Sequence, residues 1–126
     1  MKCLPVLVVL SVLAGCGGGG SDAYQQAVEL ANAKEAEARS LAVDNPCDQV
    51  SQCGTLSFVS ATGTCAGLSY KPYSLVSPTA AAASAAAAQQ QQLAGQARVL
   101  SPTPMLPCAV VAPPQLACNV SKCEAV

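Results

Sequence analysis

The chain of 126 residues contains no histidine and no tryptophan, and it has a single phenylalanine and three tyrosines. Acid and base catalysis near neutral pH most often uses histidine, so its absence removes the common hydrolase triads. The sequence also contains no phosphate-binding loop, calcium loop or dinucleotide fingerprint. We therefore expect a protein that is not an enzyme and that needs no cofactor.

Strong charge and large apolar side chains are scarce as well. After residue 15 the chain has five basic and seven acidic residues, a formal charge of 5 − 7 = −2, so nothing in it favours nucleic acid as a partner. Much of the 52% apolar fraction is alanine, which buries little area per residue. Such a core does not easily offset the chain entropy lost on folding. The composition therefore predicts a further source of stability.

The N-terminal segment has the layout of an export signal. Lys2 is followed by an apolar run from Leu4 to Leu13, which is too short to span a bilayer because spanning needs about 20 residues. The run ends in Leu13-Ala14-Gly15-Cys16, which resembles the lipobox of bacterial lipoproteins. This resemblance implies that residues 1–15 are a signal peptide and that Cys16 carries the lipid. The alternative is an ordinary cleaved signal followed by a chance cysteine.

The residues after Cys16 are expected to form a Gly-rich tether over 16–21, because Gly17 to Gly20 have no side chains to restrict their motion. One small domain over 22–126 would follow. The resemblance implies a place in the bacterial cell envelope, with the membrane as a partner through Cys16. Because position 17 is glycine and not the aspartate of many inner-membrane lipoproteins, it favours the periplasmic face of the outer membrane.

The remaining cysteines supply the expected source of stability. In a small exported domain an even number of cysteines indicates a disulfide framework, and six cysteines allow fifteen pairings. Two clusters are separated by the 42 residues between Cys65 and Cys108, so we expect a long-range bridge that joins Cys65 to Cys118 or Cys123. The six candidates are Cys47, Cys53, Cys65, Cys108, Cys118 and Cys123.

Metal binding and redox catalysis are the functional alternatives for these cysteines. Structural zinc sites usually have cysteine pairs two to four residues apart, often with histidine. Only Cys118 and Cys123, with four residues between them, have that spacing, and histidine is absent. A thioredoxin-like site needs two cysteines separated by two residues, which the chain does not have. The spacing therefore favours structural bridges and predicts no metal site.

Two Ala-rich helices are predicted, over 22–43 and over 78–99. The first segment has no Gly or Pro, with Ser21 or Asp22 as the N-cap and Asn45-Pro46 as the stop. The second begins with Ser77 as the N-cap and continues through runs of alanine and glutamine. A flexible linker is the alternative for 78–99, because its composition is of low complexity.

Three strands are predicted, over 54–60, 65–76 and 115–123. The first two are expected to form a hairpin, with Pro72 restricting 70–73 to a sheet edge or a bulge. The order of elements predicts an α+β fold in which the two helices pack on a small antiparallel sheet that is stapled by disulfides.

The sequence suggests a small recognition surface at Tyr70, Lys71 and Tyr73, although ordinary edge residues would look the same. We expect a binding or accessory module that contacts an envelope protein or a wall component. One alternative is a structural helical spacer between membrane and wall. Another is a small disulfide-rich enzyme inhibitor, which would need an exposed rigid loop such as Ala66 to Tyr73.

Overall fold

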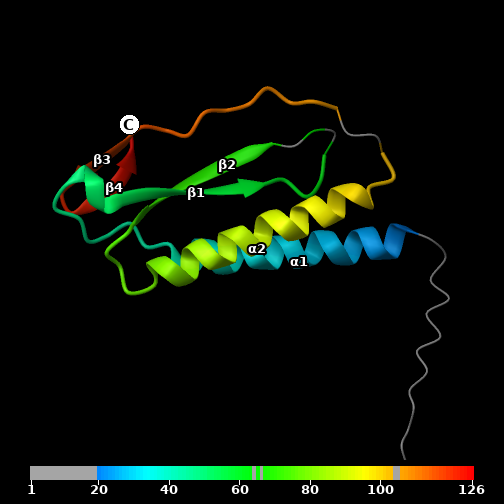
Figure 1. Cartoon of the computed structure of the whole chain (residues 1–126), viewed down its shortest axis with the longest axis horizontal. Helices are drawn as coiled ribbons and strands as arrows, with labels where there is room; N and C mark the ends of the chain where they lie inside the picture. Colours follow the sequence, from blue (N-terminus) through cyan, green and yellow to red (C-terminus); the bar gives the residue numbers. More distant parts are fainter. Residues whose placement is uncertain (1–19, 64, 66, 104–105) are drawn as a thin grey trace, which may run out of the picture.

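The computed structural model describes residues 20–63, 65, 67–103 and 106–126. Two helices lie side by side under a β-hairpin, and the segment 106–115 runs over the opposite face of that hairpin (Figure 1). A second, shorter hairpin lies at one end. The predicted α+β fold with two helices is therefore confirmed. The elements are α1 (Gly20–Leu41), the short η1 (Val50–Gln52), β1 (Cys53–Val59), β2 (Leu68–Ser74), α2 (Ala80–Val99), β3 (Leu116–Asn119) and β4 (Lys122–Ala125).

The two helices pack through alanine. Ala31 and Ala38 of α1 and Ala83, Ala94 and Ala97 of α2 are completely buried. Their small side chains allow the two helix backbones to approach closely. Alanine also stabilises each helix directly, because it has the strongest helix propensity. The region 80–99 is therefore a packed helix, and the flexible-linker alternative is wrong.

The two predicted helices are confirmed, with starts that each differ by two residues from those in the structure. Helix α1 already begins at Gly20, which places Ser21 and Asp22 in its first turn and not at the N-cap. Helix α2 begins at Ala80 after Thr79, whose side chain makes no capping hydrogen bond. Local capping preferences set the start of a helix only to within a residue or two, because several polar residues compete for the same position.

The main hairpin is formed by β1 and β2 in a continuous antiparallel register from Cys53 opposite Ser74 to Val59 opposite Leu68. The register contains no bulge at 70–73. Pro72 lies opposite Thr55. In the alternating pattern of the strand, this position turns its backbone nitrogen away from β1, so the missing N–H of proline costs no ladder hydrogen bond.

The outer edge of β1 is covered by glutamine side chains from α2. The Gln90 amide accepts a hydrogen bond from the Val59 N–H at 3.1 Å and donates one to the Val59 carbonyl at 2.6 Å. Gln91 donates to the Ser57 carbonyl at 2.9 Å. Gln90 is only 1% exposed, so water does not reach this part of the edge. Its two hydrogen bonds take the place of those that a third strand would make.

The C-terminal strand prediction over 115–123 is wrong. The chain reverses within it, so that β3 and β4 form a two-stranded sheet of their own, with Cys118 opposite Cys123. The turn residues Val120 and Ser121 have φ values of 50° and 63°. Such turns are normally made by Asn-Gly or Asp-Gly, and a Val-Ser pair carries no such signal in the sequence.

Three disulfides join the two cysteine clusters, as the even count predicted. They link Cys47 to Cys118, Cys53 to Cys123 and Cys65 to Cys108, with Cα–Cα distances of 6.0, 5.5 and 5.2 Å. The expected partner of Cys65 is therefore wrong. Cys65 follows the end of β1, whereas Cys53 begins it, and a seven-residue strand separates its ends by about 20 Å. Cys118 and Cys123 lie beside Cys53 and out of reach of Cys65.

Candidate functional site

A polar groove lies between α1 and the loop that joins β1 to β2. It holds about 340 Å³. Helix α1 contributes Asn32 and Glu35 to one wall. These two residues are nearly one turn apart and therefore share a face of the helix. The other wall comes from the loop that follows β1 and from the start of β2, and it is formed by Ser60, Ala61, Thr62, Gly67, Leu68 and Ser69.

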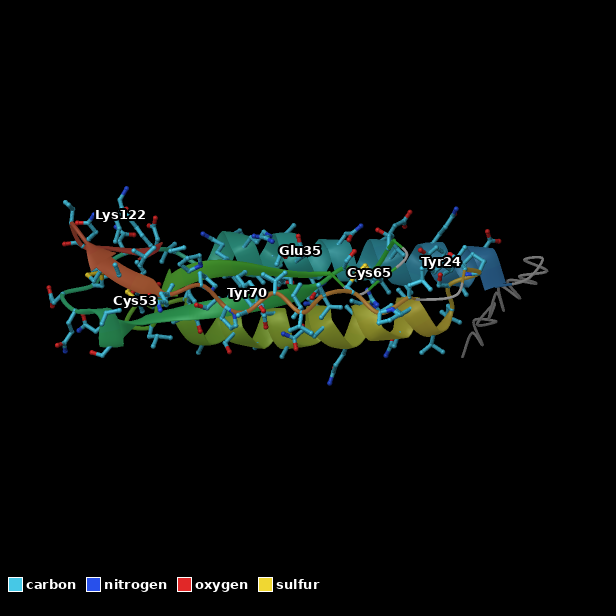
Figure 2. All side chains as sticks on the ribbon, turned by 90° about the horizontal axis from the view of Figure 1, so that it is seen from above. Tyr24, Glu35, Cys53, Cys65, Tyr70 and Lys122 are labelled. Atoms are coloured by element: carbon cyan, nitrogen blue, oxygen red, sulfur yellow. A yellow bond between two sulfur atoms is a disulfide. The ribbon has the colours of Figure 1, made fainter. Side chains whose placement is uncertain are left out.

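Arg39 connects the two walls of the groove. Its Nε donates to Glu35 Oε2 at 3.2 Å, and its Nη2 donates to Ser69 Oγ at 3.2 Å. The guanidinium also lies over the ring of Phe58, 4.5 Å from the ring centre, an arrangement that favours a cation. The Glu35 charge is therefore compensated within the groove. Figure 2 shows Glu35 near the middle of the molecule, on the helix that lies under the strands.

The loop wall is held by a second arginine and by a disulfide. Arg98 of α2 donates to the Ser60 carbonyl from Nε at 2.9 Å and from Nη2 at 2.7 Å, and also to the Cys65 carbonyl at 3.1 Å. The Cys65–Cys108 bridge attaches the same loop to the C-terminal segment. A wall fixed in this way is organised before any ligand arrives, which reduces the entropy cost of binding.

The chemistry of the groove is that of hydrogen bonding. Its lining offers the Asn32 amide, the Glu35 carboxylate and the hydroxyl groups of Ser60, Thr62 and Ser69. Its volume lies at the lower end of the range for small-ligand sites. The groove therefore suits a small polar ligand, or a polar group at the end of a larger one.

The three residues of the suggested recognition surface are not brought together. Tyr73 is 7% exposed and packs in the core with Leu56 and Phe58. Tyr70 lies three residues before Tyr73, and because side chains alternate along a strand it lies on the opposite face of the hairpin. Its hydroxyl donates a hydrogen bond to the Val111 carbonyl. Lys71 is half-buried opposite Leu56. The segment from Leu68 to Ser74 is a strand, and so it does not supply the exposed loop of the inhibitor alternative.

Sequence reasoning missed the groove and the roles of Arg39 and Arg98. The i,i+4 spacing of Glu35 and Arg39 predicts their ion pair, which the structure confirms. Nothing in the spacing indicates that Arg39 also reaches Ser69, thirty residues away. The lipidation candidate Cys16 lies outside the described residues, as do Gly17 to Gly19. Gly20 and Ser21 of the predicted tether belong to α1.

The opposite end of the molecule contains two neighbouring disulfides. The Sγ atoms of Cys47, Cys53 and Cys123 all lie within 4.8 Å of one another. Cys47 is bonded to Cys118, and Cys53 is bonded to Cys123, so four sulfur atoms gather where η1, β1 and the second hairpin meet. Figure 2 shows Cys53 and Lys122 at this end and Cys65 far from them.

No family model, no curated protein and no solved structure matches this chain. Within the part of the chain that the structure describes, neither helix has both the length and the apolar character to cross a membrane.

Proposed function

We propose that this protein is a lipid-anchored lipoprotein of the bacterial cell envelope, and that its folded domain is a small binding or accessory module without catalytic activity. The observation that carries the proposal is the bridging of all six described cysteines after an N-terminal segment that ends in Leu13-Ala14-Gly15-Cys16. Disulfides persist in oxidising compartments, and a small exported domain with a weak core depends on them. Export and disulfide bonding are thus supported by two independent parts of the chain.

The arrangement of the elements supports an anchored module. Helix α1 begins four residues after Cys16 and is 22 residues long, about 33 Å at the rise of an α-helix. The second hairpin lies at the far end of the molecule from the start of α1 (Figure 1). An anchor at Cys16 would therefore hold the start of α1 near the lipid and leave the disulfide end farthest from it (Figure 1). We propose that the anchored domain lies at the periplasmic face of the outer membrane.

The groove is the proposed contact site for an envelope protein or a wall component. Its polar lining and the compensated charge of Glu35 fit a neutral ligand that carries hydroxyl or amide groups, and they do not favour nucleic acid. Adding soluble wall fragments to the protein should shift the NMR signals of groove residues such as Asn32 and Thr62. Unchanged signals for these residues would remove wall glycan from the candidate ligands.

The decisive experiment is the intact mass of the protein recovered from membranes, for the natural chain and for Cys16→Ser. We expect the natural chain to begin at Cys16, carry acyl mass and stay with the membrane, because two acyl chains suffice for stable anchoring. Cys16→Ser should lose the acyl mass. Cys3→Ser is the matched control, since Cys3 lies within the predicted signal peptide and should have no effect. Full membrane retention of Cys16→Ser without acyl mass would contradict the anchor.

A further inference from the structure

The four cysteines at the second hairpin form one compact group of sulfur atoms. Three of the sulfurs lie within 4.8 Å of one another, and the fourth, Cys118 Sγ, is bonded to one of them. In a tetrahedral zinc–thiolate site each Zn–S bond is about 2.3 Å, which places the sulfur atoms about 3.8 Å apart. The sulfur atoms of Cys47, Cys53 and Cys123 are therefore near enough to one another to become ligands of one metal ion once the two disulfides are reduced, and Cys118 lies beside Cys47.

Two short segments deliver these cysteines in pairs. Cys47 and Cys53 flank η1, while Cys118 and Cys123 lie directly opposite each other across the second hairpin. Pairs of cysteines from two neighbouring turns are the usual construction of a structural zinc site. The spacing alone hides this construction, because Cys47 and Cys53 have five residues between them.

Backbone hydrogen bonds also connect these segments. The Cys123 N–H donates to the Asp44 carbonyl at 2.7 Å, and the Leu75 N–H donates to the Gln52 carbonyl at 2.8 Å. These bonds place the second hairpin against the chain that carries Cys47 and attach η1 to the end of β2. The positions of the four cysteines thus depend on backbone contacts as well as on the disulfides.

We infer that the reduced chain has a structural zinc site formed by Cys47, Cys53, Cys118 and Cys123. One Zn²⁺ replaces four thiol protons, which are released, and no electron is transferred. Cys47, Cys53 and Cys123 are buried and Cys118 is half-buried, as expected for a closed site that leaves no position for substrate. This end of the molecule is then closed by one metal ion in the reduced chain and by two disulfides in the oxidised chain. The inference is independent of the lipid anchor.

Cys65 and Cys108 provide an internal control. They form their bridge near the opposite end of β1, about 20 Å from the group, so they cannot share its metal ion. The variant with both Cys65→Ser and Cys108→Ser retains the four proposed ligands. Cys118→Ser removes one of them.

The test is a cobalt titration of the full chain in detergent, under anaerobic conditions and with a phosphine reductant, followed by zinc displacement. We expect one Co²⁺ per chain, with the intense visible absorption of tetrahedral cobalt bound to four thiolates. The double serine variant at Cys65 and Cys108 should bind in the same way. Cys118→Ser should weaken cobalt binding by at least about tenfold, because loss of a residue that only supports a metal ligand already weakens metal affinity by about tenfold or more. Without reductant, the disulfide-bonded chain should show no such absorption.

Three outcomes would overturn the inference. One is a weak octahedral cobalt spectrum in the reduced natural chain. Another is an equal loss of binding in the double variant and in Cys118→Ser, which would indicate unspecific thiol binding. The third is an unchanged spectrum in both Cys118→Ser and Cys123→Ser. Because the spectrum reports the ligands directly, loss of membrane anchoring in a separate experiment would leave this result unaffected.

Discussion

The helices and the main hairpin enclose two clusters of buried apolar side chains, whereas the C-terminal region, residues 106–126, reaches the interior mainly through cysteine. The first cluster combines Leu56, Phe58 and Tyr73 with alanines of both helices, and the second consists mainly of alanine. The C-terminal region contributes only a small cluster around Cys123, with Leu116 and Cys118 beside it. Val110 and Val120 of this region are exposed.

The difference shows how a chain with few large apolar residues can be held together in two ways. Alanine stabilises the packed region because it favours the helix and lets two helices approach closely. It offers no such advantage to an extended segment, where burial requires large side chains on one face of a strand. The C-terminal region has strands of only four residues each, so the disulfides replace the missing burial.

The largest effect should come from reducing the disulfides. On the chain-entropy model, closing a loop of 70 residues removes about 4 kcal/mol of unfolded-state freedom, so reduction should release the C-terminal region first. We expect the amides of 106–126 to lose hydrogen-exchange protection in metal-free reductant while α1 and α2 retain theirs. Simultaneous loss in both regions would show that the packed region also depends on the cross-links.

A smaller effect should follow from Gln90→Ala, which acts on the packed region alone. The substitution leaves the Val59 N–H and carbonyl without their partner, and each unpaired buried backbone group costs about 1–3 kcal/mol. We expect denaturant unfolding of the oxidised protein to show a stability loss of about 2 kcal/mol. The matched control is Gln92→Ala on the exposed face, with an expected change within about 0.5 kcal/mol. Equal changes in the two variants would contradict the role given to Gln90.

The smallest effect should come from Val120→Gly, which acts on the C-terminal region alone. Val120 has a φ of 50°, a left-handed conformation that costs a β-branched residue about 1–2 kcal/mol. Glycine removes that cost but adds unfolded-state entropy, so we expect a net gain of about 0.5 kcal/mol. Val110→Gly, at another exposed valine without a positive φ, should be destabilising instead. Thermal unfolding of the two variants measures this difference in sign, and a loss in both would contradict it.

The parts of the fold that follow from local preference could be predicted, and the parts that follow from long-range contact could not. Helix propensity locates both helices, and period-two alternation with a Gly-containing turn locates the main hairpin. The reversal at Val120 and Ser121 has no residue signature and was missed. Burial of Tyr73 on the helix side could not be predicted, because it depends on strand phase and on which face the helices cover.

Residue types and their spacing are enough to indicate two helices, a hairpin between them, an even set of cysteines and the lipobox-like segment that ends at Cys16. These features depend on residue types and on neighbours within a few positions, where sterics and hydrogen bonding act directly along the chain. The folded arrangement, in contrast, is needed to see that Cys65 pairs with Cys108, that Gln90 closes the edge of β1, and that the other four cysteines gather at one end. Cysteine pairing follows distance in space, and the length of β1 separates cysteines whose order in the sequence leaves every pairing open.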